Sequence, residues 1–207
     1  MNVFRNGVGK AQGLLNKMIG VLALQGDYER HSHILDLLQL QSMEIRYPDE
    51  LGMIHGLVIP GGESTTMTDL MDRNGFYKPI RKFAKDHPIL GTCAGLIMMA
   101  TSVPNSRVEP LGILNIEVDR NAYGRQVHSF TDQLPVRLDG RETQVSSTFI
   151  RAPKITRIEA GIEVICEYKG NPVAVKQGLH MGLSFHPELD NVTLFHDFIF
   201  NKQLDNK

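Results

Sequence analysis

In the first half of the chain, short, wholly apolar runs alternate with stretches whose apolar residues have helical spacing. This alternation limits the possible folds more than any other feature of the sequence. Apolar runs at residues 19–24, 57–60 and 88–91 each end at, or within two residues of, glycine or proline. Runs of this kind are typical of strands buried in a parallel sheet. Helical spacing lies between and after them, at residues 28–42, 64–73 and 76–86. The pattern predicts an α/β fold with a mainly parallel sheet.

The second half is dominated by short segments rich in β-branched residues and separated by turn residues. They lie at residues 114–118, 133–138, 145–150, 163–168 and 172–176. Such segments predict a mixed or antiparallel extension of the same sheet. Residues 181–185 then predict a core strand and residues 192–200 a C-terminal helix. We therefore expect a three-layer sandwich, in which helices flank a mainly parallel mixed sheet.

Residues 1–17 differ from the rest of the chain. They hold three glycines and no acidic residue, with no long apolar centre and no small-residue cleavage site, which argues against a secretory signal. Met18 stands directly before the first predicted strand. The alternative for residues 1–17 is a basic presequence. We expect them to be an N-terminal extension outside the fold, and residues 18–207 to form a single domain.

Charge and cysteine content exclude several functions. Lysine and arginine total 22 against 23 acidic residues, a formal net charge of −1, so no overall field favours nucleic acid or an anionic membrane. No apolar run approaches the ~20 residues of a membrane helix. Two cysteines, Cys93 and Cys166, cannot build a disulfide scaffold or a four-thiolate zinc site. We expect a cytoplasmic protein without a metal site.

Residues 91–95 read GTCAG and stand between a predicted strand and a predicted helix. This G-x-C-x-G spacing has the layout of the elbow that lifts a nucleophile above a sheet. A thiol at a helix N-terminus gains reactivity from the helix dipole, and the backbone N–H of Ala94 is placed to stabilise an oxyanion. The alternative is a small buried cysteine in a glycine-flanked turn. We interpret Cys93 as a candidate nucleophile and Cys166, in mid-strand, as a core residue.

A thiol nucleophile needs a base, and His186 is the candidate among eight histidines. It follows a core strand in the sequence SFHPE, residues 184–188. Pro187 favours an extended conformation at His186, which would keep Glu188 on the same side to orient the imidazole. The alternative is a surface His-Pro turn. His31 and His33, two positions apart on a predicted helix, point to different faces and suggest no shared site.

Residues 60–66 read PGGESTT, where a strand meets two glycines and a helix start. Exposed N–H groups at such a turn suit a carboxylate, a phosphate or an oxyanion. Ser64 or Thr65 can cap the helix, and Glu63 can bind a cationic group. The alternative is a flexible strand-to-helix turn.

Together these segments resemble the triad glutamine amidotransferases (class I) and, among them, the glutaminase subunits of pyridoxal 5′-phosphate synthases. The resemblance spans residue 18 to the C-terminal helix. The segments that carry it are LQGD (24–27), PGGESTTM (60–67), GTCAGL (91–96), RNAYGRQ (120–126), FIRAP (149–153) and SFHPE (184–188).

The resemblance implies a reaction and the residues that perform it. Cys93 would attack the glutamine side-chain amide, His186 would move the proton, and Glu188 would orient His186. Water would then release glutamate from the thioester. The oxyanion would be held at Gly62 and Ala94. The resemblance assigns glutamine binding to Gly61, Gly62, Glu63, Arg120, Ile150 and Arg151. A bidentate arginine suits a carboxylate, but Arg120 or Arg151 could instead dock a partner.

The resemblance also implies a partner. Ammonia would pass to a (β/α)8-barrel synthase subunit, which makes pyridoxal 5′-phosphate. That compound is the product of the pathway, so no cofactor is expected in this chain.

Three alternatives remain open. An amidotransferase subunit of histidine biosynthesis shares the elbow and His-Pro-Glu but fits RNAYGRQ poorly. A cysteine peptidase or deglycase commonly has histidine directly after the cysteine, where this chain has Ala94. A catalytically inactive module predicts the loss of a triad residue.

Overall fold

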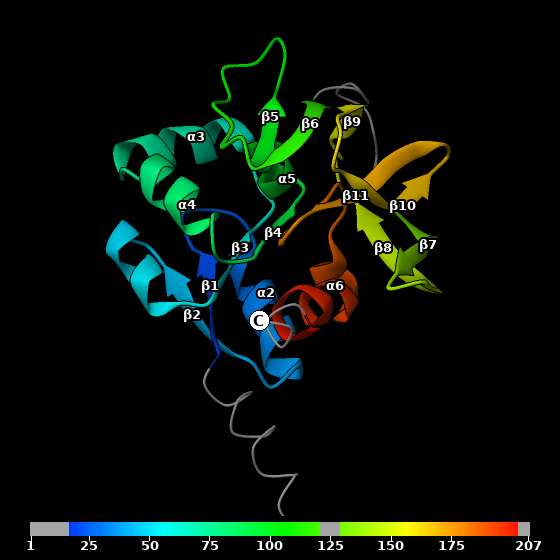
Figure 1. Ribbon diagram of the computed structural model, residues 1–207, viewed down its shortest axis with the longest axis horizontal. Helices are drawn as coiled ribbons and strands as arrows, with labels where there is room; N and C mark the ends of the chain where they lie inside the picture. Colours follow the sequence, from blue (N-terminus) through cyan, green and yellow to red (C-terminus); the bar gives the residue numbers. More distant parts are fainter. Residues whose placement is uncertain (1–16, 121–128, 203–207) are drawn as a thin grey trace, which may run out of the picture.

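A nine-stranded sheet forms the centre of the computed structural model, which describes residues 17–120 and 129–202 (Figure 1). Its strand order is β2-β1-β3-β4-β12-β11-β10-β7-β8. The first five strands in this order are parallel: β2 (Gln41–Ile45), β1 (Met18–Leu22), β3 (Gly56–Ile59), β4 (Ile89–Thr92) and β12 (His180–Leu183). The others pair antiparallel: β11 (Asn171–Gln177), β10 (Glu163–Tyr168), β7 (Phe130–Leu138) and β8 (Arg141–Phe149).

Helices cover both faces of the parallel strands, as the sequence predicts (Figure 1). One face carries η1 (Pro48–Met53), α3 (Ser64–Arg73), α4 (Tyr77–Phe83) and α5 (Ala94–Met99). The other carries α2 (Tyr28–Leu37), α6 (Leu194–Asp197) and the π-helical turn η3 (Phe198–Lys202). In β3, Leu57 and Ile59 join the first apolar cluster and Val58 joins the second, because successive strand residues face opposite sides. The three-layer α/β sandwich is confirmed.

A second, three-stranded sheet has the order β5-β6-β9. Its strands are β5 (Ala100–Ser102), β6 (Leu114–Asp119) and β9 (Lys154–Ile158). The sequence predicts β6 but neither β5 nor β9. Strand β5 has only three residues and follows α5 directly, and in β9 only Ile155 is buried, so neither carries a clear apolar alternation.

Three predicted helices are too long. The one at residues 76–86 extends past α4, which ends at Phe83. The prediction for residues 28–42 runs past the end of α2 at Leu37, since Gln39 is left-handed (φ 58°) and the chain then enters β2. The C-terminal helix begins at Leu194 and turns π-helical at Phe198. Among the residues described, none of the helices is long and apolar enough to cross a membrane. Residues 1–16 and most of RNAYGRQ lie outside the described residues.

Candidate active site

Cys93 stands on a strained turn between β4 and α5. Its φ of 50° and ψ of −103° are rare for a non-glycine residue, and this strain is typical of a nucleophile elbow. A methyl group on Gly91 would come within 2.7 Å of the Gly95 carbonyl carbon, and one on Gly95 would overlap the Ile59 carbonyl oxygen. The two glycines therefore let α5 pack against β3 and β4 tightly enough to form the elbow.

His186 and Glu188 follow β12, the parallel neighbour of β4. The His186 Nδ1 and Glu188 Oε1 atoms lie 2.6 Å apart, and the His186 backbone N–H donates to the Thr148 carbonyl of β8 at 2.9 Å. The expected pairing is present, but not through an extended chain. Pro187 begins a short 3-10 helix, η2 (Pro187–Asp190), because a proline at the first helical position costs no backbone hydrogen bond.

The imidazole of His186 and the thiol of Cys93 meet at Gly61. A methyl group built on Gly61 would lie 3.1 Å from His186 Nδ1 and 3.4 Å from Cys93 Cβ. Cys93 Sγ also lies 3.8 Å from the Ile150 carbonyl oxygen, which it can approach as a donor. Both Cys93 and His186 are almost buried, with 7% and 8% of their surface exposed.

The environment favours a protonated His186 and an ionised Glu188. Burial lowers the pKa of His186, but its hydrogen bonds with Cys93 and Glu188 outweigh burial and raise that pKa to about 10. Burial raises the pKa of the Glu188 carboxyl, but the neighbouring His31 and His186 outweigh it and lower that pKa to about 2. At neutral pH the pair is an imidazolium and a carboxylate.

The glycine loop after β3 is fixed by the turn after β1. Gly62 has a φ of 143°, a region that favours glycine. The Gln25 side-chain carbonyl accepts the backbone N–H of Glu63 at 3.1 Å. A methyl group on Gly26 would overlap the Gly61 carbonyl oxygen. Gly61 lies beside Cys93 and Gly62 beside the Gln25 side chain, and Ala94 begins α5 directly after Cys93.

Glu63 caps α3, whereas the sequence suggests Ser64 or Thr65 for that role. Its carboxylate accepts the backbone N–H groups of Thr65 at 3.2 Å and Thr66 at 2.7 Å, because its longer side chain reaches back over the first turn. Burial raises the pKa of Glu63, and these hydrogen bonds outweigh it and lower the pKa to about 2. Arg120 Nη2 lies 2.9 Å from Glu63 Oε1, so the residues expected to bind the carboxylate and the ammonium of glutamine contact each other.

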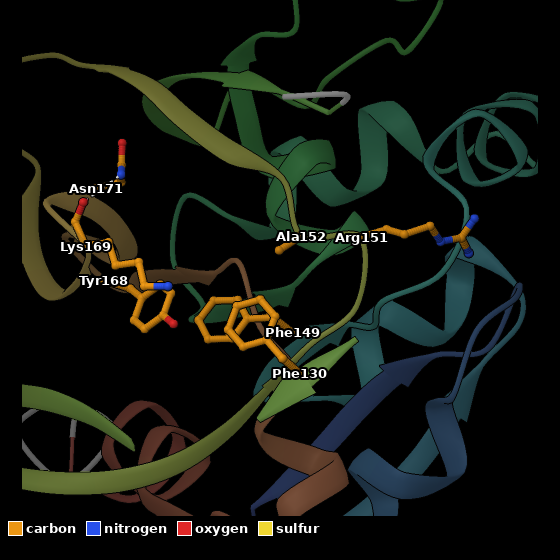
Figure 2. Close-up of a pocket in the computed structure, with 7 residues that line it drawn as sticks. All are labelled: Phe130, Phe149, Arg151, Ala152, Tyr168, Lys169 and Asn171. Carbon is orange, nitrogen blue, oxygen red and sulfur yellow. Dashed lines mark hydrogen bonds between the residues drawn. The ribbon is translucent and has the colours of Figure 1, made fainter. Parts of the chain in front are cut away.

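Arg151 is exposed, with a left-handed φ of 44°. Figure 2 shows its side chain directed away from a stack of three aromatic rings. These rings and Arg151 belong to a cavity of about 280 Å³ that includes none of the Cys93, His186 and Glu188 side chains. The cavity is lined by Phe130, Phe149, Arg151, Ala152, Tyr168, Lys169 and Asn171.

Two further buried histidines near Glu188, His31 and His196, lie outside the sequence prediction of the site. His31 Nε2 lies 3.6 Å from Glu188 Oε2, and His31 Nδ1 lies 3.0 Å from His196 Nε2. His33 is exposed, which confirms that the two helix histidines face different sides. The only local signal is that His31 precedes the buried pair Ile34 and Leu35 on one helix face. Within the described residues, no group of three histidine, cysteine or acidic side chains is placed to hold a metal ion.

Cys93 thus stands on a strand-to-helix elbow, next to a histidine–glutamate pair in a three-layer sandwich. Residues 21–205 match the SNO glutamine amidotransferase family, and the chain belongs to this family.

Curated relatives and solved structures agree with this assignment. Pyridoxal 5′-phosphate synthase subunit PdxT of Thermosipho africanus is 41% identical over 88% of this chain and 97% of its own. PdxT of Bacillus velezensis is 45% identical over 83% and 87%. A crystal structure of a glutamine amidotransferase matches with 38% identity and a TM-score of 0.81, covering 87% of this chain and 96% of that one. PurLQS from Thermotoga maritima, 16% identical, shares the fold with a TM-score of 0.69 over 91% and 99% of the two chains.

Proposed function

We propose that this chain is the glutaminase subunit of a pyridoxal 5′-phosphate synthase. It hydrolyses L-glutamine to L-glutamate and ammonia, and the ammonia passes to the synthase subunit. Family membership and the PdxT relatives support this function. The observation that carries the mechanism is the meeting of the Cys93 elbow with the His186–Glu188 pair beside Gly61.

The reaction begins with the thiolate of Cys93, whose proton resides on His186. Sulfur attacks the side-chain amide carbon of glutamine, and the N–H groups of Gly62 and Ala94 stabilise the oxyanion. The C–N bond then breaks, and His186 gives its proton to the departing ammonia. Neutral His186 next takes a proton from water, which attacks the thioester and releases glutamate and the thiolate. Glu188 stabilises the imidazolium throughout.

Glutamine is assigned to the loop and the segments that surround Cys93. The proposed binding residues are Gly61, Gly62, Glu63, Arg120, Ile150 and Arg151. Glutamine carries one ammonium and one carboxylate group, which suit an acidic side chain and an arginine. The Glu63–Arg120 ion pair provides both charges within one contact, so substrate binding has to rearrange or share it.

The enzyme we propose is a single-domain subunit of a cytoplasmic complex. Its domain is residues 18–207, with residues 1–17 as an extension, and its compartment is the cytoplasm. Its partner is a (β/α)8-barrel synthase subunit rather than a nucleic acid or a membrane. It needs no cofactor, because pyridoxal 5′-phosphate is the product of the partner.

Glutamate release from glutamine tests the proposal, measured with the purified chain alone and with a pyridoxal 5′-phosphate synthase barrel subunit. We expect a low rate alone and a large increase on addition, together with formation of pyridoxal 5′-phosphate. Cys93→Ala is expected to abolish glutamate release and still bind the barrel subunit. Retained glutaminase activity in that variant would disprove the thiol mechanism, and equal rates with and without the barrel would disprove the coupling.

A further inference from the structure

A line of buried polar side chains continues from Glu188 into the core, away from Cys93. It passes from Glu188 on η2 to His31 on α2 and then to His196 on α6, with distances of 3.6 and 3.0 Å. Thr92, the residue before Cys93, joins it through a 3.2 Å contact with His31 Nε2. His31, His196 and Thr92 have no exposed surface, and Glu188 has 1%. Polar groups buried this deeply are costly unless they are hydrogen-bonded.

The carboxylate of Glu188 shows why His31 matters. Oε1 accepts a hydrogen bond from the N–H of His186 Nδ1 at 2.6 Å. Oε2 is buried and, among the described residues, has no hydrogen-bond partner within the usual distance. His31 Nε2 lies 3.6 Å from Oε2. At this distance the contact is electrostatic, and it favours the ionised carboxylate.

These contacts select one tautomer of each buried histidine. Burial lowers the pKa of His31 and lowers that of His196 to about 3, so both rings are neutral at neutral pH and each carries one N–H. A proton on His31 Nδ1 would turn a lone pair of Nε2 toward the Glu188 carboxylate, which is repulsive. We infer from the contact with Glu188 that the proton lies on Nε2, where Thr92 Oγ1 can accept it at 3.2 Å. His31 Nδ1 then accepts the N–H of His196 Nε2.

We propose that His31 is a positioning residue for glutamine hydrolysis, which holds Glu188 through its Nε2–H so that Glu188 can keep His186 protonated beside Cys93. The inference rests on the proposed function, since it acts through the triad. His31 itself does not touch the substrate or the thiol. His196 and Thr92 are the groups that hold the His31 ring in place.

The charged and titratable groups that face His31 belong to several different elements. Glu188 on η2 and Asp27 at the start of α2 raise its pKa, whereas His186 after β12 lowers it. His196 contributes from α6. Any change in the pH response of the site therefore has to be compared with a variant of Glu188, through which the effect passes.

The test uses the pH dependence of alkylation at Cys93 in the full chain. A Cys166→Ala background leaves one thiol to react with iodoacetamide. Three variants are compared: His31→Leu removes the donor, His31→Gln places an amide N–H near the position of Nε2, and Glu188→Gln removes the charge. Leu35→Ala, one turn along the same buried face of α2, is the matched control for loosened packing. Glutamate release with the barrel subunit gives kcat and KM.

We expect His31→Leu to move the midpoint of alkylation upward by about one pH unit, a tenfold change in the reactive fraction. It should lower kcat about tenfold with KM little changed. Glu188→Gln should shift the midpoint further, His31→Gln should recover most of the loss, and Leu35→Ala should leave the midpoint unmoved.

Other outcomes separate the two proposals. A shift in Glu188→Gln without one in His31→Leu would overturn the role of His31 alone, as would equal effects of His31→Leu and Leu35→Ala. No shift in Glu188→Gln would overturn the triad and the role of His31 with it. If His31→Leu fails to fold, nitrogen NMR of the unaltered protein tests the inference instead, because it shows which nitrogen of His31 carries the proton. We expect His31 as the neutral Nε2–H tautomer, and a proton on Nδ1 would overturn the inference.

Discussion

At the scale of single residues, the candidate site needs glycines, which have no side chain, as much as it needs particular side chains. Gly61 leaves space for the His186 ring beside Cys93, since a methyl group there would overlap Cε1 of the ring and contact Cys93 Cβ. Only glycine, which has no Cβ, leaves this space free. The candidate site is therefore sensitive to the smallest possible enlargement at this position.

Gly61→Ala is expected to lower glutamine hydrolysis about 100-fold, the cost of displacing a reacting group by about 1 Å. The fold should persist, because the His186 ring can shift by rotating. Glutamate release and thermal unfolding measure the two effects. Gly52→Ala is the control, since a methyl group at Gly52 meets nothing within 4 Å. Full activity in Gly61→Ala would contradict this packing of His186 and Cys93 around Gly61.

The His186–Glu188 pair should also make stability depend on pH. The pKa of His186 is raised from 6.5 to about 10, so its contribution is complete below 6.5 and is lost as the pH rises toward 10. The pKa of Glu188 is lowered from 4.5 to about 2, so its contribution is complete above 4.5 and is lost in acid. The pair therefore stabilises the fold most between pH 4.5 and 6.5.

Glu188→Gln is expected to lower the free energy of unfolding by about 3 kcal/mol at about pH 6, because it leaves a buried imidazolium unpaired. The gap to the unaltered protein should narrow as the pH approaches 10. Urea unfolding of both proteins, at pH values between about 6 and 10, measures this difference in the free energy of unfolding. Glu142→Gln, which removes an exposed partner of Arg137, is the control and should show no such trend. A gap that widens with pH would refute the assignment of charges.

At the scale of elements, the sequence predicts whether a segment is a helix or a strand better than it predicts where that helix or strand begins and ends. The helix Ser64–Arg73 begins and ends where its spacing predicts, yet its cap is Glu63. Residue preferences favour Ser or Thr at this place, and only the folded turn brings the Glu63 carboxylate over Thr65 and Thr66. In the same way, Glu188 reaches His186 from a 3-10 turn instead of an extended strand.

Glu63→Ala is expected to cost about 1 kcal/mol of stability, the usual value of a helix cap. The loss should appear in urea unfolding of the protein without substrate. Asp69→Ala on the same helix removes an exposed ion pair with Arg107 and should change stability by less than about 0.5 kcal/mol. Equal effects of the two substitutions would show that Glu63 does not act as the cap.

At the scale of the whole molecule, the chain brings distant segments to one place. Cys93, His186 and Glu188 can be predicted from sequence because each belongs to a short motif with its own spacing. His31 and His196 are 165 residues apart and touch only through the packing of α2 against α6. No local pattern marks such a pair, and single buried histidines are ordinary core residues. The sheet order, which places β12 next to β4, is what joins the motifs.

The boundary of the fold gives a prediction at this scale. Strand β1 lies between β2 and β3, and its first residue, Met18, donates its backbone nitrogen to His55 Nδ1 at 3.3 Å. A chain that begins at Met18 keeps this nitrogen as a donor and keeps every pairing of β1. We expect it to match the full chain in urea unfolding, within about 0.5 kcal/mol, and in glutamate release.

A chain that begins at Ala23 lacks β1 and should not fold, since β2 loses its pairing partner and β3 loses one of its two partners. Loss of stability or activity on removing residues 1–17 alone would show that the domain begins before Met18.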